Sequence, residues 1–516
     1  MKLMNMPEHQ IDWLEELVKQ ISITHPNGEI IISSGHSPSG VYHIGTLREI
    51  MTANAITFEL RRQGREARHI DFVDDFDAFR KVPSNIPEEW SQYIGKPLAV
   101  VPDHSDCHKS YGAHYLAQLH AGLEAVGAMP DVTVSGYDVY QNGLLADQIE
   151  LALNGLDEVK KIITTIGGRA LDDTWAPVQI LSDEQNLRQW KYTSWDAKSR
   201  QVNYIDRDGN TGSVGINSGR VKLDWRLDWP ARWAKWGVTV EPFGRDHATK
   251  GGSYDTGKVL VDKIFSGSAP YPVPYEFINN VGDTKKMSKS AGNVLTPNQA
   301  LEVMPAEILR YFVIGSKPGK TLQFDSGIGL YQLIDNYTKA GLAESAALKY
   351  ARAVRDEETI AQIPFNHLVS VYQAASENAD STKEILERTG YKAEVRSSWP
   401  TIERELFFVA RWLEKYAPES VVFKIQKSVP KVELTEEQTY FLNLLADSIE
   451  SSMGDIDGQV MHELIYAAKD KAELKPMTAF QALYRVILGK DSGPKAGWFL
   501  SSLDAEFLVP RLRLEK

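Results

Sequence analysis

The chain has 516 residues and a formal net charge of −12, and 42% of its residues are hydrophobic. This length exceeds what one hydrophobic core supports, so we expect several domains; the charge excludes a protein coated in basic surface, although a local basic patch would still bind nucleic acid. No apolar run is long enough to cross a bilayer and residues 1–10 carry no secretory pattern, so we predict a cytoplasmic protein without membrane contact.

The first elements predict a parallel sheet. Glu29–Ser34 is an apolar run that predicts a buried strand, and the turn-forming loop Gly35–Gly40 follows it. A helical pattern begins at Thr46 and ends at Arg61–Gly64, where basic residues and a glycine are typical of a helix C-terminus. Arg68–Val73 predicts a second strand. This order of strand, helix and strand indicates a βαβ unit and therefore a parallel sheet.

The segment before this helix is the first candidate for chemistry. Ser37–Thr46 places His43 and Gly45 where the helix starts, and there the free backbone N–H groups and the helix dipole favour an anion. Glycine lets a ligand approach the backbone closely, and histidine adds a donor for a phosphate oxygen. An ordinary strand-to-helix turn with capping or surface histidines is the alternative interpretation.

A group of histidines and one cysteine suggests a metal site. His104, Cys107, His108 and His114 lie close in the sequence, and Cys107 is the single cysteine, so an internal disulfide is impossible. Zinc usually takes four ligands at favourable spacings, and we expect that the adjacent Cys107 and His108 do not share one tetrahedral centre. The sequence therefore predicts no zinc here.

The stretch from about 170 to 225 breaks the α/β pattern. Alternating residues on either side of Asp208-Gly209 predict short antiparallel strands, which we interpret as a small subdomain inserted into the α/β domain. Val259–Phe265 and Tyr275–Val281 then predict a return to the strands of the main sheet.

The segment Lys285–Asn293 is the second candidate for chemistry. Lys286 and Lys289 lie among hydroxyl groups and a glycine, which suits a mobile cationic clamp on a leaving pyrophosphate. A solvated basic loop is the alternative interpretation.

The last third of the chain is predicted to be an all-α domain. Thr296-Pro297 is a plausible helix cap and first helical position. Helical patterns recur after it, at Glu405–Lys415, Thr435–Glu450 and Thr478–Leu488.

The two candidate segments together resemble the two signatures of class I aminoacyl-tRNA synthetases, and Lys286 follows His43 at a separation of 243 positions. The first segment departs from its signature at Thr46, where histidine or asparagine is usual. Further stretches across most of the chain resemble the class I lysyl-tRNA synthetases, among them Asp74–Pro83, Val101–Asp103, Ser110–Gly112, Lys222–Trp233, Phe243–His247, Gly251–Gly257, Tyr416–Glu419 and Gly493-Pro494.

This resemblance implies an α/β fold, with a Rossmann-type parallel-sheet catalytic domain, an inserted small subdomain and an all-α C-terminal domain. We expect the catalytic domain over 1–320, the insertion over about 137–225, a connecting stem-contact region over 321–365 and an anticodon-binding domain over 366–516. A basic strip of the helical part would contact tRNA phosphates, or is an ordinary solvated face: Arg404, Arg411, Lys415, Lys424, Lys427 and Lys431.

The resemblance also implies a lysine–tRNA ligase. Such an enzyme activates L-lysine with ATP and Mg²⁺ to lysyl-adenylate and transfers it to the 3′-terminal adenosine of tRNA(Lys). We expect a monomer. We also expect no structural zinc, because the cysteine ligands that some relatives carry are missing from the insertion. A class I synthetase for another amino acid, and a tRNA-binding relative without catalysis, remain the alternatives.

Site residues are carried over by the same resemblance. The catalytic residues would be His43, Gly45, Thr46, Lys286 and Lys289. The ATP-binding residues would be Pro38, Ser39, Gly40, His43, Gly45, Gly244, Asp246, Met287, Ser288 and Lys289. The lysine-binding residues would be Ser34, Gly35, Asp75, Trp225, His247 and Tyr275, and no metal ligand is expected.

A cationic substrate agrees with the residue types in these stretches. A lysine ammonium group needs aromatic faces and acceptors. The available faces are Trp225, Trp229, Tyr254 and Tyr275, and the available acceptors are Asp74, Asp75 and Asp228. Any single tryptophan could instead belong to the core.

Overall fold

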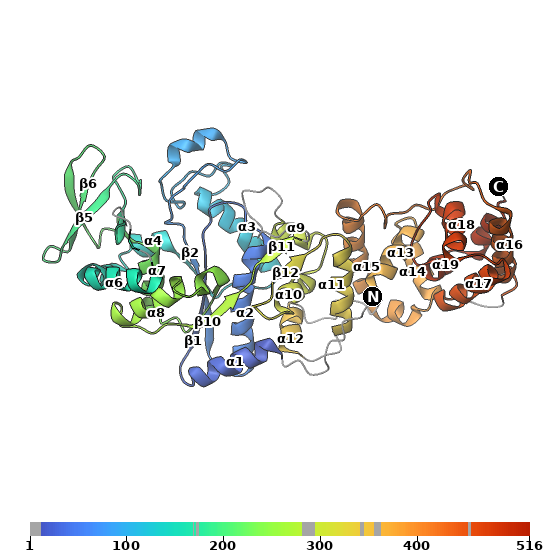
Figure 1. The fold of residues 1–516 in the computed structure, drawn as a ribbon, viewed down its shortest axis with the longest axis horizontal. Helices are drawn as coiled ribbons and strands as arrows, with labels where there is room; N and C mark the ends of the chain where they lie inside the picture. The colour runs from blue at the N-terminus through green and yellow to red at the C-terminus, as the bar shows by residue number, and fades with distance from the viewer. Residues whose placement is uncertain are drawn as a thin grey trace. The chain divides into compact units, whose positions relative to one another are not determined.

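The computed structural model describes residues 12–168, 170–171, 175–280, 295–340, 345–354, 363–452 and 456–515. The chain forms two compact units. The first comprises Met1–Leu301, Leu309–Phe324 and Glu344–Val354, and the second comprises Glu302–Ile308, Asp325–Ala343 and Arg355–Lys516. Figure 1 colours the chain from its first residue to its last.

A five-stranded parallel sheet forms the centre of the first unit, which confirms the predicted fold class. Its strands lie in the order β10 (Tyr271–Tyr275), β9 (Val240–Gly244), β1 (Ile30–His36), β2 (Ala67–Val73) and β3 (Val132–Ser135). The chain starts in the middle of the sheet and extends it first toward β3 and later toward β10. In such open sheets a ligand binds beyond the carboxyl ends of the strands where the direction of extension changes, which is here between β1 and β9.

Helix α2 (Leu47–Arg62) packs on β1, β2 and β9. A 3-10 turn, η1 (Ile44–Thr46), precedes it, and Gly64 follows it with a φ of +80°. The predicted strand–helix–strand unit is thereby confirmed. Since α2 begins directly beyond the end of β1, its N-terminus lies at the carboxyl edge of the sheet.

Two predictions about the later strands were wrong. Val259–Phe265 belongs mostly to helix α8 (Ser253–Lys263), in which Tyr254, Gly257 and Val261 are buried at helical spacing. A short apolar run such as Val259–Phe265 does not distinguish a strand from a buried helix segment, and for this reason it was predicted as a strand. Strand β10 ends at Tyr275 instead of beginning there, and its two prolines are tolerated because it is an edge strand.

The predicted short antiparallel strands are confirmed. Strands β5 (Lys191–Asp196), β6 (Gln201–Ile205) and β7 (Thr211–Gly215) form an antiparallel meander. Beside it, β4 (Val178–Ile180) pairs with β8 (Val221–Leu223), also antiparallel. The rings of Trp190 and Tyr204 stack 3.9 Å apart. In the described residues of the insertion, packing and hydrogen bonds hold these strands.

The first unit contains further helices, 3-10 turns and strands (Figure 1). They are α1 (Trp13–Thr24), η2 (Glu88–Tyr93), α3 (Tyr111–Ala125), α4 (Gly136–Gln141), α5 (Ala146–Asn154), α6 (Leu156–Gly167), α7 (Trp225–Trp236), η3 (Arg245–Ala248), β11 (Ile278–Asn280), α9 (Pro297–Leu301), β12 (Leu322–Phe324) and α12 (Ala346–Arg352). Helix α10 (Ala306–Ile314) has residues in both units.

The described part of the second unit is helical, as predicted. Its helices are α11 (Ile328–Ala340), α13 (Phe365–Ala374), α14 (Ala379–Arg388), α15 (Lys392–Lys415), α16 (Glu436–Glu450), α17 (Gly458–Lys471), α18 (Pro476–Leu488), α19 (Ala496–Ser501) and α20 (Ala505–Leu512). Helix α16 begins after Thr435, whose side chain forms a capping box with Gln438. Phe441, Leu483 and Phe499 are fully buried in the core of this unit.

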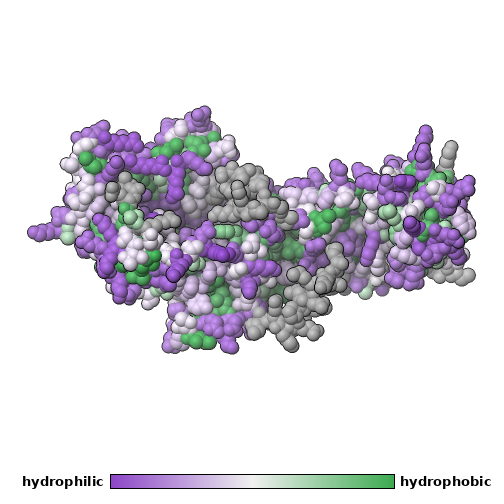
Figure 2. Space-filling model, viewed as in Figure 1, coloured by the Kyte–Doolittle hydropathy of each residue, from purple (hydrophilic) through white to green (hydrophobic). Residues whose placement is uncertain are grey.

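Figure 2 shows a face on which hydrophilic side chains dominate and hydrophobic ones form small separate patches. Among the described helices, none is both long and apolar enough to cross a bilayer.

Candidate functional site

Two adjoining pockets lie at the carboxyl edge of the central sheet. The first, of about 190 Å³, is lined by Trp225, Trp229 and Trp233 among others, and we call it the tryptophan pocket. The second, of about 200 Å³, includes His43, and we call it the histidine pocket. Gly35 and Glu49 line both pockets. Gly35 is the penultimate residue of β1, so the pockets meet at the switch point of the sheet.

The histidine pocket has the features of an anion site. It is lined by the predicted residues His43, Gly45, Thr46 and Tyr275. Nδ1 of His43 accepts a hydrogen bond from the Gly45 N–H at 3.1 Å, so the neutral ring carries its proton on Nε2 as a donor. A Cβ atom at Gly45 would lie only 2.6 Å from the His43 ring, and this close approach requires glycine. The start of η1 and α2 adds its dipole and free N–H groups.

Glu241 lies buried in the tryptophan pocket. Its carboxyl group accepts hydrogen bonds from Ser33 Oγ at 2.8 Å, from Trp229 Nε1 at 3.0 Å and from Trp233 Nε1. Burial raises the pKa of Glu241 to about 7, although these hydrogen bonds oppose the shift. Among the described residues it has no cationic partner in an ion pair.

Glu49 joins the two pockets. Its carboxyl group accepts the Gly35 N–H at 2.8 Å and the Tyr275 hydroxyl at 2.5 Å. Burial raises its pKa to about 7 as well, and Glu241 contributes to the shift. No described lysine or arginine pairs with it. The two cations of the tryptophan pocket, Lys222 and Arg232, form their ion pairs with aspartates. Two glutamates that face this cavity outside those ion pairs favour a cationic ligand, since its charge would compensate theirs.

The predicted acceptors have other partners. Asp74 and Asp228 both pair with Arg232, the former at 2.7 Å. Asp75 lines neither pocket: its carboxylate accepts Ser135 Oγ and the Tyr137 N–H, each at 2.7 Å, and holds the start of α4. Asp75 is thus engaged by hydrogen bonds outside the pockets, and Asp77 of the pocket lining pairs with Lys222. The carboxyl groups of the lining that form no ion pair with a described residue are those of Glu49 and Glu241.

Aromatic side chains line the tryptophan pocket unequally. Trp233 is 1% exposed and belongs to the core, whereas Trp225 is 44% exposed. The ring of His247 lies 6.3 Å from Trp225 and 5.4 Å from Trp229. Ser34, which donates to Asp71 at 2.6 Å, also lines this pocket. Among the predicted lysine-binding residues, Ser34, Gly35, Trp225 and His247 thus meet here, and Tyr275 lies in the adjoining pocket.

The other predicted ATP-binding residues that the structure describes line neither pocket. Pro38, Ser39 and Gly40 form the loop from β1 to η1, where Tyr111 donates to the Ser39 carbonyl at 3.2 Å. Gly244 ends β9, and Asp246 belongs to η3 directly after it. The predicted clamp residues Lys286, Met287, Ser288 and Lys289 lie outside the described residues.

Residues 11–368 match the model of a family described as tRNA synthetases class I (K). The chain belongs to this family of class I tRNA synthetases. It is 36% identical to lysine–tRNA ligase 1 of Methanosarcina acetivorans, over 97% of this chain and 98% of that one. It is 38% identical to the lysine–tRNA ligase of Archaeoglobus fulgidus, over 93% and 96% of the two chains.

A solved glutamate tRNA ligase of Elizabethkingia meningosepticum resembles the synthetase chain less closely. The match covers 94% of this chain and 98% of the glutamate tRNA ligase chain, with 13% identity and a TM-score of 0.42. At that level the likeness carries no argument about the site.

Glu49 and Glu241 were missed by sequence reasoning. Glu241 is the one charged residue of the run Val238–Gly244, and Glu49 lies at the start of α2 among the buried residues Leu47, Arg48, Ile50 and Met51. A carboxyl group within an apolar segment is a signal for a perturbed group at a functional site of a synthetase, and it was available in the sequence.

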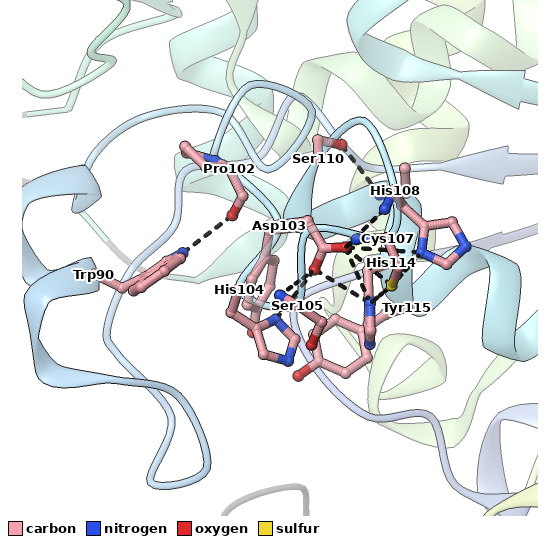
Figure 3. Close-up of polar contacts among 12 residues, drawn as sticks. Trp90, Pro102, Asp103, His104, Ser105, Cys107, His108, Ser110, His114 and Tyr115 are labelled. Atoms are coloured by element: carbon pink, nitrogen blue, oxygen red, sulfur yellow. Dashed lines mark hydrogen bonds and ion pairs between the residues drawn. The ribbon is translucent and has the colours of Figure 1, made fainter.

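The synthetase also contains a candidate metal centre, shown in Figure 3. One ligand atom each of Asp103, Cys107, His108 and His114 lies within 4.8 Å of all the others. Cys107 Sγ is 3.0 Å from His108 Nδ1 and 3.3 Å from His114 Nδ1, while Asp103 is 3.2 Å from His114 Nδ1. The adjacent residues Cys107 and His108 thus both direct a ligand atom toward the same cluster. One sulfur, two imidazoles and a carboxylate are the donors that tetrahedral zinc prefers, and these four residues could hold it.

Proposed function

We propose that the chain is a lysine–tRNA ligase, which forms lysyl-adenylate from L-lysine and ATP and transfers the lysyl group to the 3′-terminal adenosine of tRNA(Lys). One observation carries the choice of lysine. Glu49 and Glu241 face one tryptophan-walled cavity and form no ion pair with a described residue, whereas the cations of that cavity, Lys222 and Arg232, pair with aspartates. The names of the two related ligases support the same substrate.

In this proposal, lysine occupies the tryptophan pocket with its ε-ammonium group toward Glu241 and its α-ammonium group toward Glu49, where the two pockets meet. Trp225 covers the apolar part of the substrate chain and His247 closes the pocket beside it. Ser34, Gly35 and Tyr275 surround the other end of lysine, where the two pockets meet. The two ammonium groups then replace the protons that the two buried carboxyl groups would otherwise hold.

ATP enters as its magnesium complex and lies with its phosphates in the histidine pocket. His43 and Thr46 donate to phosphate oxygens, and the backbone at Gly45 approaches them closely. The adenosine contacts fall to Pro38, Ser39, Gly40, Gly244 and Asp246. Met287 and Ser288 would lie against the nucleotide, and Lys286 and Lys289 would neutralise the leaving pyrophosphate.

No side chain acts as a covalent nucleophile in this reaction. The lysine carboxylate attacks the α-phosphate, the bond to pyrophosphate breaks, and a hydroxyl of the terminal adenosine later displaces AMP from the adenylate. Because both pockets meet at Gly35, the two substrates are held in contact, and catalysis is positioning plus stabilisation of charge.

The proposal extends to the whole chain. Residues 1–320 would form the catalytic domain with its insertion over about 137–225, residues 321–365 would contact the tRNA stem, and residues 366–516 would bind the anticodon end. The enzyme would act in the cytoplasm as a monomer.

ATP–pyrophosphate exchange with each of the twenty amino acids tests the proposed function. Lysine should support exchange far more strongly than any other amino acid. Exchange with a different amino acid would identify a synthetase of other specificity. Binding of tRNA without exchange for any amino acid would identify a relative without catalysis.

A further inference from the structure

A buried carboxylate lies behind the two proposed substrate pockets and has no part in the mechanism given above. Asp71 belongs to β2, is fully buried and stands in register with Ser34 of β1. Its Oδ1 accepts a hydrogen bond from Ser34 Oγ at 2.6 Å, and its Oδ2 lies 2.8 Å from Nε2 of His36. Ser34 lines the tryptophan pocket and His36 lines the histidine pocket, so one carboxylate supports a side chain in each pocket.

His36 is the cation of this buried pair. A buried carboxylate is costly without a counter-charge, and among the described residues Asp71 pairs with no lysine or arginine. The side chain of His36 is 8% exposed and supplies the counter-charge. Burial alone would lower the pKa of His36, but Asp71 raises it overall. Burial raises the pKa of Asp71 in turn, but His36 lowers it overall, so the two groups favour the ionised form of each other.

The second nitrogen of the His36 ring is held as well. Nδ1 lies 2.5 Å from the hydroxyl group of Tyr42, and the two rings meet edge to face with their centroids 5.0 Å apart. Tyr42 is 3% exposed and belongs to the loop between β1 and η1. A protonated imidazole donates from both nitrogens, here to a carboxylate and to a hydroxyl oxygen. These two contacts fix the ring in one orientation at the wall of the histidine pocket.

Other titratable groups near His36 do not replace it as the cation. They are Tyr42 and His43 in the loop, Glu49 on α2, His69 and Asp71 on β2, Asp74 directly after β2, and His120 on α3. Burial lowers the pKa of His69 to about 4 and also lowers the pKa of His120, so both rings are mainly neutral near pH 7. Asp74 pairs with Arg232 at 2.7 Å. Among these described groups, His36 is therefore the ring that a carboxylate holds in its charged form.

We propose that His36 and Asp71 position ATP: the charged ring of His36 is a fixed positive wall of the histidine pocket, against which the triphosphate is held while the lysine carboxylate attacks. This role rests on the proposed function. A charge that is oriented before the substrate arrives stabilises the negative charge of the reacting phosphate without reorganisation, and it does so most strongly where water is excluded. Asp71 lines neither pocket, so it acts through His36 as a positioning residue.

The experiment measures ATP–pyrophosphate exchange with the full chain at saturating lysine. His36→Gln removes the charge of the ring, whereas His36→Lys keeps a cation beside Asp71. Asp71→Asn removes the charge of the carboxylate but keeps an oxygen that accepts from Ser34. Glu59→Gln is the matched control, because Glu59 is also fully buried, pairs with Arg62 at 2.7 Å and lines neither pocket.

His36→Gln and Asp71→Asn should each lower kcat/KM for ATP by about 10- to 100-fold, which is less than the loss of a donor in direct contact with the reacting group. The Michaelis constant for lysine should stay within about threefold of wild type, because the lysine contacts proposed above remain. His36→Lys should recover most of the activity that His36→Gln loses. Glu59→Gln should keep the ATP kinetics of wild type.

The pH profile of kcat/KM for ATP separates a charge from a purely structural contact. In wild type it should fall as pH rises through the raised pKa of His36, because the ring then loses its proton. In Asp71→Asn the effect of burial prevails, so the fall should move to lower pH by about 1–3 units. His36→Lys should show no fall in this interval, since a lysine beside a carboxylate stays protonated to higher pH.

The outcomes separate this inference from the proposed function. Unchanged ATP kinetics and an unchanged pH profile in His36→Gln, with normal lysine exchange in wild type, would overturn the positioning role and leave the ligase intact. Equal losses for ATP and lysine in His36→Gln, His36→Lys and Glu59→Gln would show that these ion pairs serve folding alone, and would also overturn it. If Asp71→Asn does not fold, the comparison of His36→Gln with His36→Lys decides. Absence of lysine exchange in wild type would instead contradict the proposed function.

Discussion

At the scale of single residues, the acidity of two buried carboxyl groups controls what the catalytic unit can bind. Glu49 and Glu241 each have a pKa raised to about 7 by burial. Their unfolded pKa is near 4.5, so the folded protein holds more protons between about pH 4.5 and 7, and their contribution to stability falls as pH rises through that window. A bound ammonium group relieves this penalty.

The affinity for lysine should therefore rise with pH. Between pH 6 and 8 the two groups pass from mainly protonated to mainly ionised, while the lysine ammonium group stays charged. We expect the Michaelis constant for lysine to fall about tenfold over this interval. Exchange kinetics with saturating ATP measure it, and a lysine constant that is flat or rises with pH would contradict the assignment.

Glu241→Gln keeps the size of the side chain and removes its charge. The kcat/KM for lysine should fall by about 10- to 150-fold, the range for a hydrogen bond to a charged group, and the pH dependence should become shallower. The Michaelis constant for ATP should stay near wild type. Glu66→Gln, on an exposed glutamate, is the matched control. Equal losses for lysine and ATP would indicate a general structural defect instead.

Gly45→Ala tests the close approach in the histidine pocket. The added Cβ would lie 2.6 Å from the His43 ring and displace it from the phosphate site. We expect adenylate formation to slow by about 10²-fold or more, as for the loss of one oxyanion donor, with little change in lysine affinity. Gly215→Ala is the control, because a Cβ there meets nothing within 4 Å. Full activity of Gly45→Ala would remove His43 from the proposed role.

At the scale of elements, local patterns predicted the first strand–helix–strand unit and the antiparallel strands of the first unit, but not its pockets. The β1–α2–β2 unit follows from a helical pattern, which ends in basic residues and a glycine, between two apolar runs, and the structure has it. Strand β9 was not predicted, because its order in the sheet depends on pairing with β1 across about 200 residues of chain. Glu49 and Glu241 come from α2 and β9, so their meeting at one pocket needed the sheet order that sequence patterns do not contain.

The loop between η2 and α3 contributes three of the four residues of the candidate metal centre, Asp103, Cys107 and His108. Consecutive residues such as Cys107 and His108 converge there because the chain turns at Asp106, which has a φ of +55°. We expect one zinc ion per chain by metal analysis of protein purified without chelator. Cys107→Ser and His114→Ala should each lower the zinc content at least severalfold, whereas His462→Ala, on a histidine in the second unit, should not. Zinc well below one per chain in wild type would restore the expectation of no zinc.

At the scale of the whole molecule, the first unit is assembled from three stretches of chain. The guanidinium group of Arg310, in the second stretch, donates to the carbonyl of Tyr350, in the third, at 2.6 and 2.9 Å, and also to those of Val126 and Gly127. A fragment that ends at residue 320 leaves this buried cation without one of its acceptors. Its free energy of unfolding should be lower than that of a fragment that ends at residue 354 by about 1–3 kcal/mol or more, so its denaturation midpoint should also be lower. Equal denaturation midpoints would contradict this role of the third stretch.

The same interleaving sets an order on synthesis. When residue 301 leaves the ribosome, the first unit is still incomplete, because its stretches Leu309–Phe324 and Glu344–Val354 have not been made. Parts of the second unit are synthesised between these stretches. The first unit therefore matures only while the second has begun to form. A ribosome that stalls early would release a protein with an open, apolar seam, and such seams are what chaperones bind.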